Sequence, residues 1–94
     1  MAIYNITATG QFKRDLKLAK KRGLSIDELF KVVDDLADDI PLPAQNHNHP
    51  LQGDYKGCWE CHITPDWLLI YSKDKEIKII TLKRTGTHSD LFGK

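Results

Sequence analysis

The sequence has few of the features that place a protein in or beyond a membrane. No apolar run approaches the roughly 20 residues that a membrane-spanning helix needs. The first residues, MAIYNITATG, lack the basic start and apolar stretch of a secretory signal. Only two cysteines occur among 94 residues, which argues against a disulfide scaffold. We therefore expect a cytoplasmic chain that forms one domain over residues 1–94.

Both cysteines fall in the motif CWECH, residues 58–62, which has the C-x-x-C-H spacing of covalent haem attachment. Haem of this type is attached outside the cytoplasm, so the haem interpretation is weak. Side chains alternate along a strand, so Cys58 and Cys61 are expected to point to opposite faces. A four-ligand zinc site would also have to recruit His47 or His49, because there is no second cysteine pair. We expect neither a metal nor a cofactor here. A zinc-binding domain would require that the strand assignment around Cys58 is wrong.

The first half of the chain has the pattern of one strand and two helices. AIYNIT, residues 2–7, is rich in strand formers, and apolar residues at helical spacing predict a helix over residues 9–23. Ser25, with a glutamate three residues later, forms a capping box for a second helix. The apolar stripe of this helix runs to Ile40, and Pro41 is expected to end it.

The second half is expected to supply most of a sheet. Prolines, asparagines and glycines make residues 41–57 irregular, and strands are predicted at residues 58–64, 67–72 and 76–85, before a short tail. The order is β-α-α-β-β-β. The predicted fold is α+β: an N-terminal strand and an antiparallel αα-hairpin packed on one face of a small antiparallel sheet.

Charge is unevenly distributed although the net charge is only +1. The first predicted helix carries the basic residues Lys13, Arg14, Lys17, Lys20, Lys21 and Arg22. The second carries the acidic residues Asp27, Glu28, Asp34, Asp35, Asp38 and Asp39, and the C-terminal part is basic again. Basic surfaces of this kind suit a polyanion or an acidic protein partner. Ordinary solvated helix faces are the alternative explanation.

Several acid–base side chains are expected to gather at one end of the sheet. Glu60 and His62 share a strand face, Asp66 occupies the following turn, and His49 lies just before the strand. Arg84 and His88 are expected beyond the last strand, at the same end of the sheet. Imidazoles titrate near pH 6.5 and suit acid–base chemistry at neutral pH. RNA cleavage needs a base for the 2′-hydroxyl, an acid for the leaving oxygen and positive charge for the phosphorane. The residue types therefore favour a metal-free ribonuclease.

Three segments carry a resemblance to a known family. They are PLPAQNHNHPLQGDYKG (residues 41–57), CHITPDWLLIY (residues 61–71) and LKRTGTHSDLFG (residues 82–93). Together they resemble the YafQ branch of the RelE/ParE superfamily, the toxins of bacterial type II toxin–antitoxin modules. The resemblance covers nearly the whole chain and implies a RelE-like fold.

The resemblance implies an mRNA interferase that enters the ribosomal A site and cuts mRNA there, without a metal, by attack of the 2′-hydroxyl on the neighbouring phosphate. The implied catalytic residues are His49, His62, Asp66 and His88. The implied substrate-binding residues are Arg84, Phe92 and Glu60. His88 is the best candidate for the general acid, and Asp66 or His49 for the base. His47 does not match the family pattern and is interpreted as a solvated loop residue.

The resemblance also implies partners and leaves alternatives. A cognate antitoxin is expected to form a heterotetramer with the toxin and to bind operator DNA, and no membrane partner is expected.

Relatives often have R-D-x-H where this chain has Trp59 to His62, so a basic residue is missing. Trp59 is expected to face the core with Cys61 and Ile63. The competing interpretations are a ParE-like toxin that binds gyrase without cutting RNA, and a degenerate toxin that acts only as a corepressor.

Overall fold

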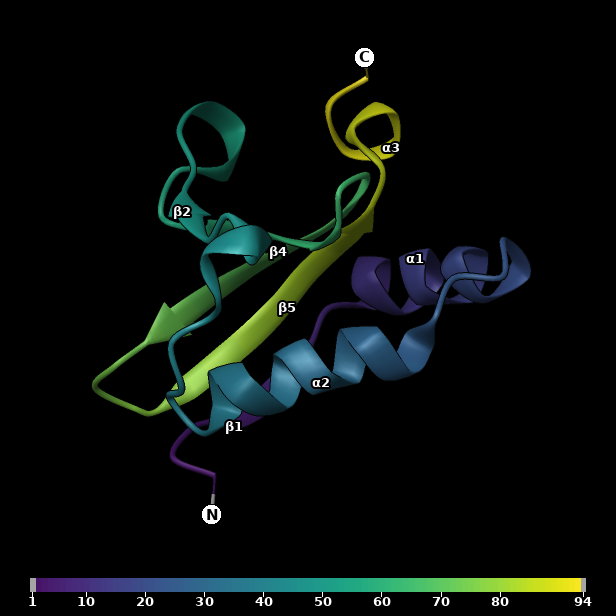
Figure 1. The fold of residues 1–94 in the computed structure, drawn as a ribbon. Coiled ribbons are helices and arrows are strands. Elements are labelled where there is room, and N and C mark those ends of the chain that lie inside the picture. Colours follow the sequence, from purple (N-terminus) through teal and green to yellow (C-terminus); the bar gives the residue numbers. More distant parts are fainter. Residues whose placement is uncertain (1, 94) are drawn as a thin grey trace.

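The structure, a computed structural model, describes residues 2–93 and consists of a five-stranded sheet with helices on both faces (Figure 1). The strands are β1 (Asn5–Ala8), β2 (His49–Pro50), β3 (Trp59–Thr64), β4 (Trp67–Asp74) and β5 (Ile79–Gly86). The helices are α1 (Gly10–Lys21), α2 (Ile26–Ala37) and α3 (His88–Phe92), with 3₁₀ turns η1 (Ala44–Asn46) and η2 (Gly53–Tyr55). The predicted α+β fold is confirmed.

The sheet order is β1-β5-β4-β3-β2. All neighbouring strands are antiparallel except β1 and β5, which run parallel. The prediction of an antiparallel sheet is therefore wrong at this edge. β5 lies beside β1 and runs in the same direction, with residues 5–8 paired to residues 79–82.

The two long helices begin and end at residues with suitable side chains. Thr9 caps α1 by accepting a hydrogen bond from the Phe12 amide at 3.0 Å, and Ser25 caps α2 as predicted. The expectation that α2 runs to Ile40 is wrong, because the helix stops at Ala37. Asp39 takes a left-handed conformation (φ 57°) and the amide of Ile40 bonds back to the Asp35 carbonyl, which ends the helix before the proline.

The two faces of the sheet are covered differently. Helices α1 and α2 lie together on one face (Figure 1), and Phe12, Leu29 and Val33 pack there against Leu69 and Ile80 of the sheet. The opposite face has a smaller apolar cluster. Leu68, Ile70 and Leu91 form it, and Leu51, Tyr55 and Cys58 pack against it. Within residues 2–93, the short helix α3 and the segment around η2 cover this second face, which leaves room for polar side chains.

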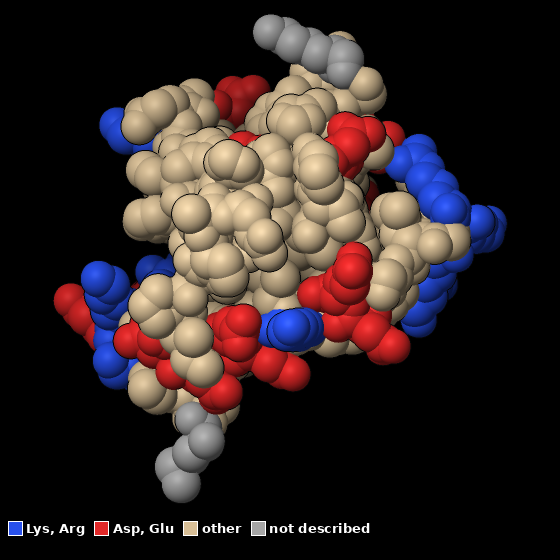
Figure 2. Space-filling model, in the orientation of Figure 1, with Lys and Arg blue, Asp and Glu red and all other residues tan. Residues whose placement is uncertain are grey.

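The two long helices also carry opposite charge. The basic residues of α1 are exposed, and Figure 2 shows basic side chains gathered at the α1 end of the molecule and acidic side chains along α2. The predicted separation of charge is confirmed. None of the described helices is long and apolar enough to cross a membrane.

Candidate active site

Cys61 lies in β3 and Cys58 directly before it, and their side chains lie on opposite faces of the sheet, as predicted. Cys61 is fully buried in the core under the helices, whereas Cys58 packs against the small cluster on the other face. Burial, with a smaller effect of the Glu60 charge, raises the pKa of the Cys61 thiol to about 12. The two sulfurs therefore do not form one metal or redox site.

Trp59 departs from expectation. Its side chain is 38% exposed, although it shares a strand face with Cys61 and Ile63. It pairs across the sheet with Tyr71 and borders a shallow pocket with Asn48, beyond the core that the helices cover. The prediction that Trp59 enters the core is wrong. The prediction that it faces away from Glu60 holds, so the residue in place of the family's arginine lies on the face opposite the histidines.

Glu60 links two histidines. The two-residue strand β2 places His49 directly opposite Glu60, and the His49 Nε2 lies 3.6 Å from Glu60 Oε2. The Nε2 of His62 lies 3.6 Å from the other carboxylate oxygen. Glu60 is buried, with 5% of the residue exposed. A buried carboxylate between two imidazoles can orient both rings and compensate positive charge on either.

The other ring nitrogen of each histidine faces a backbone carbonyl. The His49 Nδ1 lies 3.2 Å from the Pro50 oxygen, and the His62 Nδ1 lies 3.3 Å from the Pro65 oxygen. A backbone carbonyl can only accept a hydrogen bond, so each Nδ1 pairs with its carbonyl in the forms of the ring that carry hydrogen on that nitrogen. The Nε2 of each ring faces the Glu60 carboxylate, which accepts a hydrogen bond from that nitrogen when it carries a proton.

His88 completes the cluster from the C-terminal side. It is the first residue of α3, and its Nδ1 lies 3.7 Å from an oxygen of Asp66 in the β3–β4 turn. Its ring centroid lies 5.7 Å from that of His62. Phe92, one turn later, has its ring centroid 6.3 Å from that of His88 and also contacts Tyr55 edge-on at 5.9 Å. All four residues of the predicted catalytic set thus lie within one linked group.

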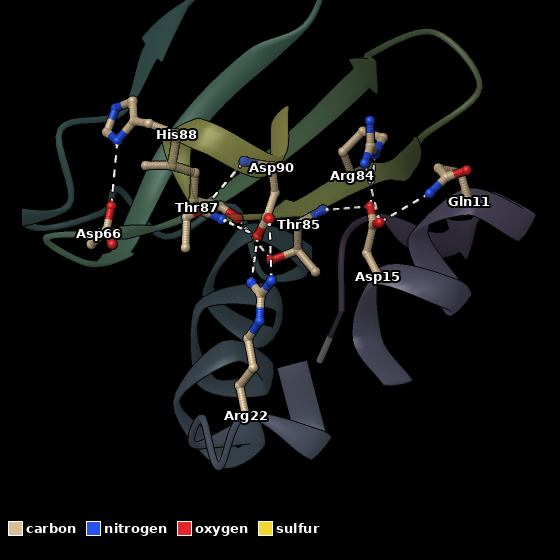
Figure 3. Close-up of polar contacts among 10 residues, drawn as sticks. Gln11, Asp15, Arg22, Asp66, Arg84, Thr85, Thr87, His88 and Asp90 are labelled. Carbon is tan, nitrogen blue, oxygen red and sulfur yellow. Dashed lines mark hydrogen bonds and ion pairs between the residues drawn. The ribbon is translucent and has the colours of Figure 1, made fainter. Parts of the chain in front are cut away.

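Arg84 is placed differently. Figure 3 shows its guanidinium directed toward Asp15 of α1 and apart from His88. The Nε–Oδ2 distance is 2.7 Å and the Nη2–Oδ1 distance is 3.2 Å, and Asp15 also accepts the Thr85 amide. The hydrogen bond to Asp15 raises the pKa of Arg84 above its ordinary value, partial burial opposes that, and a contact with Tyr55 adds to it. Arg84 is therefore already paired.

The sequence interpretation missed three residues of this region. Asp15 holds Arg84, Tyr55 contacts both Arg84 and Phe92, and Asn46 donates to the His62 carbonyl at 2.7 Å. Asp15 lies outside the segments that carry the resemblance, and Asn46 and Tyr55 lie within one of them without a role assigned to them. All three reach the site through tertiary packing. The fourth histidine, His47, is exposed in a loop as expected, and its ring centroid lies 5.2 Å from that of His62.

One part of the site has the donors of a metal centre. His49, Glu60 and His62 offer ligand atoms that all lie within 4.8 Å of one another. Two imidazoles and one carboxylate are donors that Zn²⁺ and similar transition ions accept, whereas Mg²⁺ prefers oxygen ligands. These residues can hold such an ion after a small contraction of the cluster.

Sequence and structure comparisons agree on the family to which a chain with this fold belongs. The model of the family described as bacterial toxins of type II toxin–antitoxin systems, YafQ, matches residues 4–93, and the chain belongs to that family. The mRNA interferase toxin YafQ of Escherichia coli strain K12 is 42% identical over 90 residues, covering 95% of this chain and 96% of the relative. The predicted family is confirmed.

Solved structures give the same result. The crystal structure of YafQ from Escherichia coli strain BL21(DE3) superposes with a TM-score of 0.89 at 41% identity, covering 96% of this chain and 99% of the other. The toxin of the Escherichia coli DinJ–YafQ toxin–antitoxin complex superposes with a TM-score of 0.88 at 41% identity, covering 97% and 99%.

Proposed function

We propose that this chain is the endoribonuclease toxin of a type II toxin–antitoxin system, an mRNA interferase that cuts mRNA in the ribosomal A site without a metal ion. Its family and its 42% identity to an Escherichia coli mRNA interferase support the reaction class. The observation that carries the proposal is the gathering of three imidazoles and two carboxylates on the thinly covered face of the sheet. The chain acts as one toxin domain in the cytoplasm, where ribosomes translate.

The reaction is a transfer of the phosphate from O5′ to O2′. A base takes the proton of the 2′-hydroxyl, O2′ bonds to the adjacent phosphorus, and the bond from phosphorus to O5′ breaks. An acid protonates the departing O5′. The products are a 2′,3′-cyclic phosphate and a 5′-hydroxyl. The imidazole that acts as base ends with one more proton, and the imidazole that acts as acid ends with one fewer.

The geometry supports a division of labour among the histidines. His88 is exposed at the start of α3 with Asp66 on its Nδ1, so it can present a proton on Nε2 to the leaving oxygen. His49 is the better base, because the Asp66 carboxylate is already directed at His88. His62 lies between them and, with Glu60 behind it, supplies positive charge near the phosphorane.

Substrate and ribosome contacts surround this group. Phe92 offers an aromatic face beside His88 and is contacted edge-on by Tyr55, and a base of the mRNA stacks on Phe92. Arg84 reaches the substrate phosphate only if it exchanges its contact with Asp15 for the phosphate. The exposed basic face of α1 contacts ribosomal RNA, with an affinity that falls as salt rises.

A cognate antitoxin neutralises the toxin. The Escherichia coli relative is solved as a DinJ–YafQ toxin–antitoxin complex, which supports a partner of this kind. The assembly is a heterotetramer in which the antitoxin binds operator DNA.

Primer extension on a reporter mRNA in a translating extract tests the proposal. Wild-type protein is expected to give discrete cuts within codons only while ribosomes translate, and His88→Ala to give none. His47→Asn, which removes a neighbouring imidazole, is the matched control and is expected to keep cutting. Intact mRNA in an extract whose translation stops would contradict the proposal and favour a non-nucleolytic target.

A further inference from the structure

The helix that carries His88 is too short to be stable alone. α3 has five residues, and an isolated helix needs roughly 12–15 residues even with a favourable sequence. Its apolar anchor is a single buried side chain, Leu91, packed on Leu68 and Ile70 of β4. Because His88 and Phe92 are its exposed ends, whatever fixes α3 also fixes the general acid and the aromatic face beside it.

Asp90 is the centre of the polar contacts that hold α3 (Figure 3). Its Oδ2 accepts the Thr87 amide at 3.0 Å, and its own amide bonds the Thr87 hydroxyl at 3.2 Å, which closes a capping box around His88. A Cβ added at Gly86 would lie only 3.0 Å from the Asp90 side chain. The start of α3 therefore fits tightly against the end of β5.

One contact joins this capping box to the helical hairpin. Arg22, directly after α1, donates to Asp90 from both terminal guanidinium nitrogens, Nη1–Oδ2 at 2.5 Å and Nη2–Oδ1 at 3.3 Å. The two residues are 68 positions apart in the chain. They border a cavity of about 220 Å³ that also meets Leu18 and Gly86. Because of this cavity, α3 does not pack closely on the side that faces α1. The two hydrogen bonds from Arg22 to Asp90 bridge the space between them.

We propose that Arg22 is a positioning residue that sets the orientation of α3 through Asp90 and so places His88 against Asp66 and the scissile phosphate. The inference rests on the proposed function for its catalytic consequence, but not for its effect on α3. A two-pronged contact fixes both the distance and the rotation of the helix, which a single hydrogen bond does not. The ion pair is exposed and its loss costs the whole fold little, so its main effect falls on this short element.

The catalytic test compares Arg22→Ala with Arg14→Ala on programmed ribosomes. Arg14 lies within α1, is exposed, and hydrogen-bonds to Gln11 on its own helix, so its replacement removes the same charge without touching α3. Loss of charge weakens ribosome binding and raises KM in both variants. We expect Arg22→Ala alone to lower kcat as well, on the order of tenfold to a hundredfold, because small misplacements of a catalytic group have effects of that size.

Two further readouts separate positioning from general stability. Amide hydrogen exchange at Leu91 and Gly93, whose amides bond within α3, is expected to accelerate in Arg22→Ala and not in Arg14→Ala, while exchange in β4 stays unchanged. Arg22→Lys is expected to recover part of kcat, since an ammonium group pairs with one oxygen and cannot form the fork. Equal kcat for the two alanine variants, or unchanged exchange in α3, would overturn the inference. If the wild type cuts no mRNA, the proposed function fails, and the exchange result still decides whether Arg22 orders α3.

Discussion

Asp15 and Arg84 form a two-pronged ion pair between α1 and β5, although they are 69 positions apart. The same carboxylate accepts the amide of Thr85, and the Thr85 hydroxyl donates to the Leu68 carbonyl at 2.7 Å. One side chain of the helical hairpin therefore anchors the end of β5, from which the chain continues directly to His88. The ion pair has a structural role in the free protein, whether or not Arg84 later contacts a phosphate.

Replacing Asp15 is expected to destabilise the fold. Asp15→Ala removes the carboxylate that pairs with the partly buried guanidinium and accepts the Thr85 amide, and we expect the free energy of unfolding to fall by about 1–3 kcal/mol. Urea denaturation measures this, with Asp34→Ala on the exposed surface of α2 as the control. A loss no larger than that of the control would show that the ion pair has no structural role.

The Arg22–Asp90 pair predicts a specific dependence on pH. The hydrogen bond from Arg22, followed by that from the Thr87 amide, lowers the pKa of Asp90 to about 2 from an ordinary value of 3.8. A lowered pKa contributes stability above about pH 4 and loses it as the pH falls toward 2. We expect the stability difference between wild type and Asp90→Asn to shrink over this window. A difference that stays constant from pH 5 to pH 2 would mean that the carboxylate is not selectively stabilised.

Zinc is expected to inhibit the enzyme by occupying His49, Glu60 and His62. An ion bound there takes the Nε2 lone pairs, so the base is lost. Cleavage on ribosomes should fall with micromolar Zn²⁺ and recover with a zinc-selective chelator, while Mg²⁺ stays constant for the ribosome. Cobalt absorption spectra measure binding directly. Binding that survives Glu60→Gln together with His62→Ala would place the ion elsewhere.

Strand alternation could predict much of the site. It places Glu60 and His62 on one face and Cys61 on the other, because the period of two is a local property of the backbone. The helix α3 was missed, although the signal was present: Thr87 and Asp90 have capping-box spacing. That sequence was interpreted as a tail because the helix is only five residues long.

Other features could not be derived from the sequence. The pairing of His49 with Glu60 depends on a two-residue strand in a segment whose composition indicates only a loop. The contacts of Arg84 with Asp15 and of Arg22 with Asp90 depend on how the hairpin docks on the sheet. Trp59 lies on the strand face that carries core residues such as Cys61, but the helices do not extend far enough to cover its side chain.

The most direct test of the account is a single-turnover assay on purified ribosomes that carry a defined A-site codon. The products are analysed for their end groups, with wild type, His49→Ala and His88→Ala compared in parallel. The account predicts a 2′,3′-cyclic phosphate and a 5′-hydroxyl from wild type, with the rate falling at least a hundredfold in each variant. Cleavage by both variants at the wild-type rate, or a 5′-phosphate at the cut, would contradict it.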